Sequence, residues 1–200
     1  MMSGLFKKVV QWFSNPPTET NVEEQRGKRF INALKEWTGK TTATIVFDST
    51  IDEFTDDQLF NKVKGKPNVA VIGFTTEGDV FGGFYSVAVT KQRKDFYDPN
   101  IFAFSFESHG RCMTPQRFVV KEGRREEAFV RFLKDNSQGF VNFWVGGGGF
   151  RLGNERSKSF CWYMSRGFEG LEDRTLTGKD GDWEEGPHHH CARLVAVQLE

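Results

Sequence analysis

Nine short apolar segments in succession, between residues 68 and 199, constrain the fold of this 200-residue chain most strongly. Most of them alternate apolar and polar residues or run apolar over about four to eight positions, and turn-forming residues separate them. Because no helical pattern lies between successive segments, the order favours antiparallel pairing over parallel β-α-β units. The chain is therefore predicted to be mainly β with flanking helices, a two-sheet antiparallel β-sandwich with strands at 68–76, 80–90, 101–108, 117–121, 128–134, 139–145, 150–153, 159–164 and 191–199.

The N-terminal segment has the pattern of an amphipathic helix. Residues 2–13 place their apolar side chains on one helical face and two lysines opposite. We therefore expect residues 1–17 to form an arm that docks on its own domain or on a partner, with a membrane-surface helix over 2–13 as the alternative. Residues 18–200 are expected to form a single domain.

Two further helices are predicted ahead of the strands. One begins at Thr20 and ends at Gly39, with Phe30, Ile31, Leu34 and Trp37 as its buried stripe. The other is short, runs from a capping box at Thr55 and Gln58 to Gly65, and buries Leu59, Phe60 and Val63.

Two glycines interrupt the segment VFGGFYSVAVT. Glycine weakens a strand, because it packs no side chain and loses the most entropy on folding. Gly82 and Gly83 would lie on opposite faces of the strand, each flanked by bulky groups that include Phe81 and Phe84. We therefore predict that a neighbouring aromatic ring or backbone segment lies close over each gap. The run Gly146, Gly147, Gly148 and Gly149 is predicted to allow a similar close crossing, because no phosphate-loop sequence follows it.

These glycines, and the segments around them, resemble the TLDc domain of oxidation-resistance proteins over about residues 43–200. The similar segments are IVFDSTIDEFTDDQLFNKVKGKPNVAVIGFTTEGDVFGGFYS, IFAFSF, FWVGGGGFRLGNE and the closing ARLVAVQLE. The last strand departs from the family pattern, since Ala196 and Gln198 stand where the family usually carries an acidic residue and a tryptophan. The insert at 121–138 and the long acidic loop at 169–190 depart from it as well.

The resemblance implies a sandwich of two antiparallel sheets and a role in protection against oxidative stress. Several members of this family bind the vacuolar proton-pumping ATPase. The resemblance therefore also implies that subunits of this pump are the expected protein partner. The family has no accepted active site. We therefore expect a non-enzymatic protein that acts through protein–protein contacts and needs no cofactor.

Two segments carry residue types that could bind a metal. His188 and His190 would share one face of an extended strand, and with Cys112 or Cys161 they could bind zinc. The loop 173–184 partly fits a calcium loop. Neither spacing is complete, so a solvated strand entry and a solvated loop are favoured and no metal is expected.

Three arginines are the candidates for contact with nucleic acid. Arg124, Arg125 and Arg131 lie in a segment that also carries Glu122, Glu126 and Glu127, which favours a salt-bridged surface. The chain has 27 basic and 27 acidic residues, so no basic excess supports a duplex-binding surface. A stress-responsive, sequence-specific DNA-binding regulator remains an alternative function.

The three cysteines, which lie far apart in the sequence, do not form a disulfide framework. They favour a reducing compartment, so we expect a cytoplasmic or nuclear protein. No apolar run approaches the roughly 18–20 residues that span a bilayer. Cys112 follows Arg111, and a cationic neighbour can activate a thiol, so a cysteine-dependent peroxide-metabolising enzyme is the second alternative.

Overall fold

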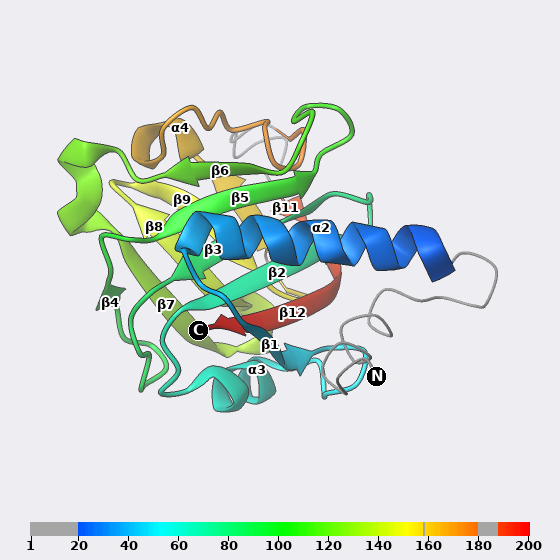
Figure 1. The fold of residues 1–200 in the computed structure, drawn as a ribbon. Coiled ribbons are helices and arrows are strands. Elements are labelled where there is room, and N and C mark those ends of the chain that lie inside the picture. The colour runs from blue at the N-terminus through cyan, green and yellow to red at the C-terminus, as the bar shows by residue number, and fades with distance from the viewer. Residues whose placement is uncertain (1–19, 158, 180–187) are drawn as a thin grey trace.

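A computed structural model describes residues 20–157, 159–179 and 188–200 as two six-stranded antiparallel sheets packed face to face (Figure 1). The predicted fold class is confirmed. The predicted arm over 1–17 and its helix over 2–13 lie outside the described residues.

The first sheet contains the C-terminal strand and the glycine hairpin. Its spatial order is β1 (Ala43–Asp48), β12 (Cys191–Leu199), β2 (Val69–Thr75), β3 (Val80–Tyr85), β5 (Phe102–Glu107) and β6 (Gln116–Val119). The second sheet has the order β11 (His188–His189), β10 (Ser159–Trp162), β9 (Gly148–Leu152), β8 (Gly139–Val145), β7 (Phe129–Asp135) and β4 (Phe96–Tyr97).

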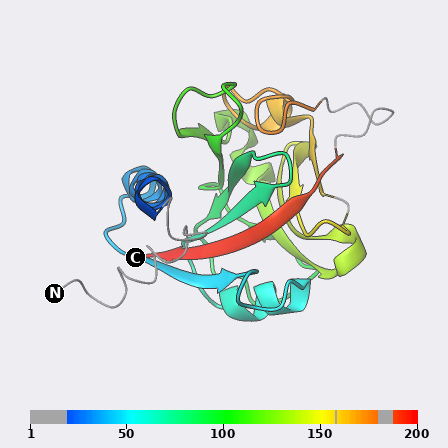
Figure 2. The same ribbon diagram turned by 90° about the vertical axis from the view of Figure 1, so that its right-hand side faces the viewer.

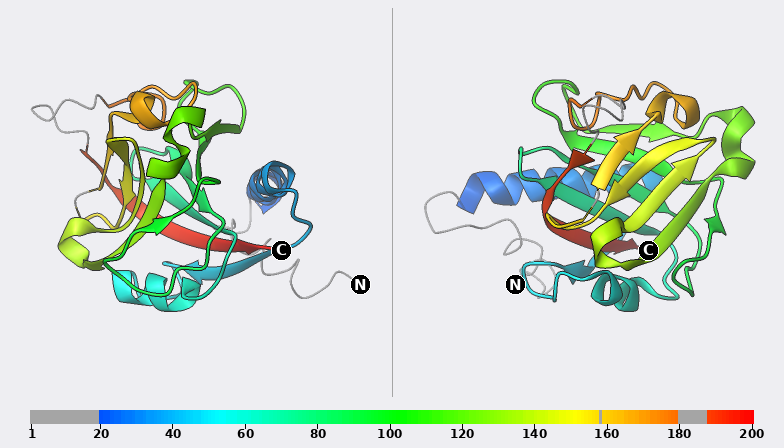
Figure 3. Two further views of the ribbon diagram at one scale, coloured as in Figure 1. Left: turned by 90° about the vertical axis from the view of Figure 1, so that its left-hand side faces the viewer. Right: turned by 180° about the vertical axis from the view of Figure 1, so that it is seen from behind.

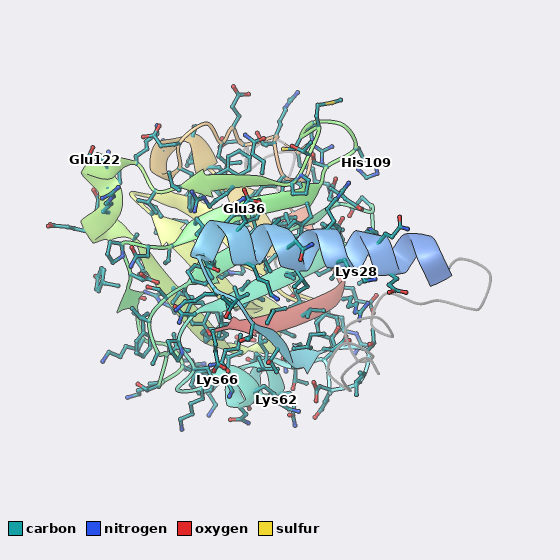
Figure 4. All side chains as sticks on the ribbon, in the orientation of Figure 1. Lys28, Glu36, Lys62, Lys66, His109 and Glu122 are labelled. Atoms are coloured by element: carbon teal, nitrogen blue, oxygen red, sulfur yellow. The ribbon has the colours of Figure 1, made fainter. Side chains whose placement is uncertain are left out.

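Helices cover the two sheets unequally. Viewed from the side, α2 (Thr20–Thr38) stacks on the outer face of the first sheet, and the second sheet lies on the far side (Figure 2). The predicted stripe of α2 is confirmed, because Phe30, Ile31 and Leu34 are buried and Trp37 packs against Phe102, Phe104 and Phe106. Charged side chains such as Lys28 and Glu36 line the opposite side of this helix (Figure 4).

The remaining helices are short. In α3 (Asp56–Val63) the Thr55 hydroxyl accepts a hydrogen bond from the Gln58 amide at 3.3 Å, and the three predicted core residues are buried, as expected. The other helices are α4 (Met164–Gly167) and the 3-10 helices η1 (Glu122–Glu127) and η2 (Asn136–Gln138). Seen from behind, the strands of the second sheet face the viewer, with α4, η1 and η2 at the edges of the sheet (Figure 3, right).

Apolar side chains fill two layers. The main core lies between the sheets and is rich in phenylalanine, with Phe47, Phe81, Phe132, Phe143 and Phe150 fully buried. A second cluster, which includes Phe30, Phe84 and Phe104, lies between the first sheet and α2.

Several predicted bounds are corrected by the structure. The strand expected at 80–90 ends at Tyr85, and the strand expected at 159–164 ends at Trp162, where α4 follows. The loop predicted to be solvated is packed over its described part, because Leu176 and Thr177 are buried. Among the residues that the structure describes, no helix is both long and apolar enough to cross a membrane.

Candidate functional site

The glycine pair in β3 is a packing device on both faces of the strand. A Cβ atom built on Gly83 would lie 2.6 Å from the ring of Phe143, which belongs to the opposite sheet. A Cβ atom on Gly82 would lie 1.9 Å from the carbonyl oxygen of Val71 in β2 and 2.8 Å from the ring of Phe104. The predicted close approach over each gap is therefore confirmed, with Phe81 and Phe84 buried on either side.

In the second glycine run, two residues form a turn and two allow close approach of neighbouring backbone. Gly146 and Gly147 have φ values of 56° and 83°, so they form the tight hairpin turn between β8 and β9. A Cβ atom would lie 2.0 Å from the carbonyl oxygen of Tyr163 if built on Gly148, and 2.2 Å from that of Phe143 if built on Gly149. This run also permits a close crossing, as predicted.

All three cysteine thiols are buried. Burial raises the pKa of Cys161 far above its ordinary value and raises the pKa of Cys191 to about 12. The guanidinium of Arg111 does not face Cys112 as an activating group. It donates to the Asp79 carboxylate at 2.6 Å and to the Leu176 carbonyl oxygen at 3.1 Å. These environments keep the two core thiols protonated and therefore poor nucleophiles.

The histidine segment alternates as predicted but is less solvated than expected. His190 is exposed, His188 is half-buried, and His189 and Cys191 are fully buried. Burial lowers the pKa of His189 to about 3, and its ring lies 5.0 Å from that of Phe81. The predicted solvated strand entry is thus wrong at His189, because the chain passes between the sheets at this point. Within the described residues, no group of three or more His, Cys, Asp or Glu side chains is placed to hold a metal ion.

The three candidate arginines have different surroundings. Arg124 pairs with Glu127 at 2.8 Å on η1, and Arg131 forms a bidentate ion pair with Asp95. Arg125 lines a groove of about 380 Å³ with Trp37, beside the C-terminal end of α2. Two of the three charges are therefore already neutralised within the chain.

The outer face of the second sheet carries a set of side chains of which the sequence analysis singled out only Arg131. In β7 to β10 the inward positions, such as Phe132, Phe143 and Cys161, belong to the core. The alternate positions therefore point outward. We call six of these outward residues, together with Tyr97 of β4, the aromatic–arginine face: Tyr97, Phe129, Arg131, Trp144, Arg151, Phe160 and Trp162.

Strand register arranges the aromatic–arginine face in two rows. One row runs across four strands and β4, from Tyr97 through Phe129, Trp144 and Gly149 to Trp162. The other row runs from Arg131 through Asn142 and Arg151 to Phe160.

Gly149 brings the two tryptophans of the first row together. A Cβ atom on Gly149 would lie 2.9 Å from Cε3 of Trp144. Without that atom the rings of Trp144 and Trp162 approach to 5.9 Å between centroids. Tyr97, at the end of the row, is 64% exposed.

Arginine side chains lie over rings of the same face. The Arg151 guanidinium is 4.7 Å from the ring centroid of Phe160, and that of Arg131 is 5.4 Å from Phe129. These are the distances of cation–π contacts.

The two arginines differ in their partners. Asp95 raises the pKa of Arg131 by its hydrogen bonds. Among the described residues, Arg151 donates only to neutral oxygens, the Asn142 Oδ1 at 2.7 Å and the Gln138 carbonyl at 2.6 Å. Burial and the nearby charge of Arg131 lower the pKa of Arg151. The face therefore holds one positive charge that no described carboxylate neutralises.

A comparison with known protein families matches the part of the chain that contains these features. A family model described as the TLDc domain matches residues 20–161. That range contains both glycine runs and all of the aromatic–arginine face except Trp162. No curated protein matches the chain.

Proposed function

Because the chain belongs to the TLDc domain family, we propose that this oxidative-stress-related protein acts without catalysis, through contacts with other proteins. The observation that carries the proposal is the aromatic–arginine face, which lies on the side of the second sheet that faces away from the first sheet; Figure 3 (right) shows the ribbon from this side. Aromatic residues and arginine are the residue types enriched in the energetically important parts of protein interfaces.

The two layers beneath this face favour a rigid support. The second sheet packs on the first through a continuous core, in which Phe143 fills the gap at Gly83 and stacks on Phe150 at 5.0 Å. A rigid surface loses little conformational entropy on binding, which benefits affinity.

The environment of the thiols argues against peroxide chemistry as the main function. Peroxide-reactive cysteines need an accessible thiolate. All three thiols, including that of the candidate Cys112, are instead buried, and burial keeps Cys161 and Cys191 protonated. The family's role in oxidative stress is then better served by binding than by turnover.

The vacuolar proton-pumping ATPase is the expected partner. The test is capture of the pump by the tagged full chain from a lysate, with antibodies against pump subunits as the readout. We expect pump subunits to be recovered with the wild-type chain. Their absence under gentle conditions would exclude this partner.

The catalytic alternative has its own measurement. Peroxide turnover by the purified chain should be at background level, and Cys112→Ser should leave it unchanged. Turnover that depends on Cys112 would contradict the non-enzymatic proposal.

A further inference from the structure

The aromatic–arginine face combines apolar rings with unbalanced positive charge. Asp135, at the far end of β7, is the only acidic residue in strands β7 to β10. Its side chain accepts hydrogen bonds from Ser137, so it is directed to its own turn. Apart from Asp95, which is paired with Arg131, the described residues therefore place no carboxylate at the centre of the face.

Arg151 is the residue whose charge and remaining hydrogen-bond donor a partner would pair. It is half-buried, and its Nε and Nη1 atoms donate to Asn142 and Gln138. Its Nη2 atom donates to no acceptor among the described residues. A guanidinium in a partly desolvated site gains most from a carboxylate, which it can hold in a bidentate geometry.

We propose that the aromatic–arginine face docks an acidic segment of a partner protein, with a carboxylate on Arg151 and an apolar side chain against Trp144 and Trp162. This inference rests on the proposed function, because it specifies the partner's chemistry. Because neighbouring strands lie about 4.8 Å apart, the four strands β7 to β10 are wide enough for about five or six extended residues of the partner segment.

The same features favour a protein segment over a nucleic acid. A single strand of nucleic acid needs ring faces open to stacking and a groove of positive charge along its backbone. Here guanidinium groups already lie over Phe129 and Phe160. Of the two arginines on the face, Arg131 is neutralised by Asp95. One available charge among aromatic rings suits one carboxylate better than a row of phosphates.

The test uses the full chain and two labelled peptides of about eight residues, one alternating Glu with Leu and the other Gln with Leu. We expect the acidic peptide to bind and the Gln peptide to bind at least tenfold more weakly. Arg151→Gln should weaken binding of the acidic peptide by about tenfold or more, because the guanidinium is lost. Arg125→Gln, on the exposed helix η1, is the matched control and should change the affinity less than about twofold.

A second measurement needs no variant. In a heteronuclear NMR titration of the wild-type chain, the indole N–H signals of Trp144 and Trp162 should shift with the acidic peptide. The signal of Trp37, which packs under α2 on the other side of the molecule, should stay in place. This readout remains valid if Arg151→Gln fails to fold.

Three results would overturn the inference. They are equal binding of the two peptides, a shift of the Trp37 signal alone, and a single-stranded oligonucleotide that binds more tightly than the acidic peptide at the same indoles. Pump capture that survives Arg151→Gln would overturn this docking face and leave the proposed function standing. Peptide binding without pump capture would support this docking face and overturn the pump as the partner in the proposed function.

Discussion

Gly83 leaves space for one ring of the opposite sheet. Phe143 occupies that space and is held between Phe150, stacked at 5.0 Å, and Tyr85 at 6.5 Å. A glycine inside a strand is costly in isolation, so its presence indicates that packing offsets the loss. The sequence alone indicated that something must lie over the gap, because bulky residues flank it.

Replacing Gly83 by alanine should therefore destabilise the whole domain. The added Cβ atom would lie 2.6 Å from the Phe143 ring, which has no room to retreat in a filled core. We expect Gly83→Ala to lower the free energy of unfolding by about 2–3 kcal/mol, the cost of an overpacked core. The midpoint and slope of urea unfolding measure this difference.

Gly123 in η1 supplies the matched control. A Cβ atom there meets nothing within 4 Å, so Gly123→Ala should change the free energy of unfolding by less than about 0.5 kcal/mol. Equal losses for the two variants would show that glycine flexibility, and not the space beside Phe143, is what matters at position 83.

The aromatic–arginine face could not be predicted in the same way. Alternation shows which residues of a strand lie on the same face as Trp144 or Trp162, but it does not show which face of each strand is buried. Their proximity depends on the register of β8, β9 and β10, which no local pattern determines. The candidate residues Arg124 and Arg125 were suggested by charge alone, and only Arg131 proved to lie on this face.

At the scale of elements, long periodic segments were predicted well and short ones were missed. Two-residue strands such as β4 and β11 are too short to show a period of two. The described part of the acidic loop was expected to be solvated, because Leu171 and Leu176 are its only apolar residues between 169 and 179. Tertiary contacts bury part of this segment although its composition is mostly polar.

Arg111 supplies the main polar contacts of that segment. Its guanidinium donates to the backbone oxygens of Thr175 and Leu176, and to Asp79 at the tip of the glycine hairpin. His109, on the same loop, also contacts Asp79 at 2.8 Å and lies at the edge of the molecule (Figure 4). The hairpin, the loop at 108–111 and the segment at 171–179 are thus joined through the guanidinium of Arg111.

Arg111→Ala should loosen this segment and leave the sheets intact. The variant loses the three hydrogen bonds that the guanidinium donates, two of them to this segment. This lowers the free energy of local opening, so amides of residues 172–179 should exchange about tenfold faster or more. Hydrogen exchange followed by mass spectrometry measures this rate. Arg156→Ala, an exposed arginine in the loop after β9, should leave it unchanged. Unchanged exchange in Arg111→Ala would mean that burial of Leu176 alone holds the segment.

At the scale of the whole molecule, the last thirteen residues, 188–200, tie the two sheets together. β11 pairs with β10 in the second sheet, and β12 pairs with β1 and β2 in the first. The chain crosses between the sheets at His190, which places His189 and Cys191 in the interior. The ring nitrogens of His189 have no hydrogen-bond partner among the described residues.

Global stability should therefore depend on pH through His189. The pKa of this residue is about 3 in the folded chain and about 6.5 in the unfolded chain. Below pH 6.5 the unfolded chain takes up the proton first, so stability is full above pH 6.5 and falls as the pH drops toward 3. Between pH 6.5 and pH 4 we expect the free energy of unfolding to decrease by up to about 3 kcal/mol from this residue.

Chemical unfolding of the wild type, His189→Gln and His190→Gln at pH 7, 5.5 and 4 separates the contribution of His189 from that of the carboxylates, which also titrate in acid. His189→Gln removes the buried imidazole, so its loss of stability between pH 6.5 and 4 should be smaller than that of the wild type. His190→Gln removes an exposed imidazole next to it and should keep the wild-type dependence. If both variants follow the wild-type curve, the acid sensitivity of the sandwich resides in its carboxylates, and the Asp48–Arg193 pair becomes the first to test. That pair joins β1 to β12 at 2.6 Å, and its hydrogen bonds hold the pKa of Asp48 below the ordinary value against the effect of burial.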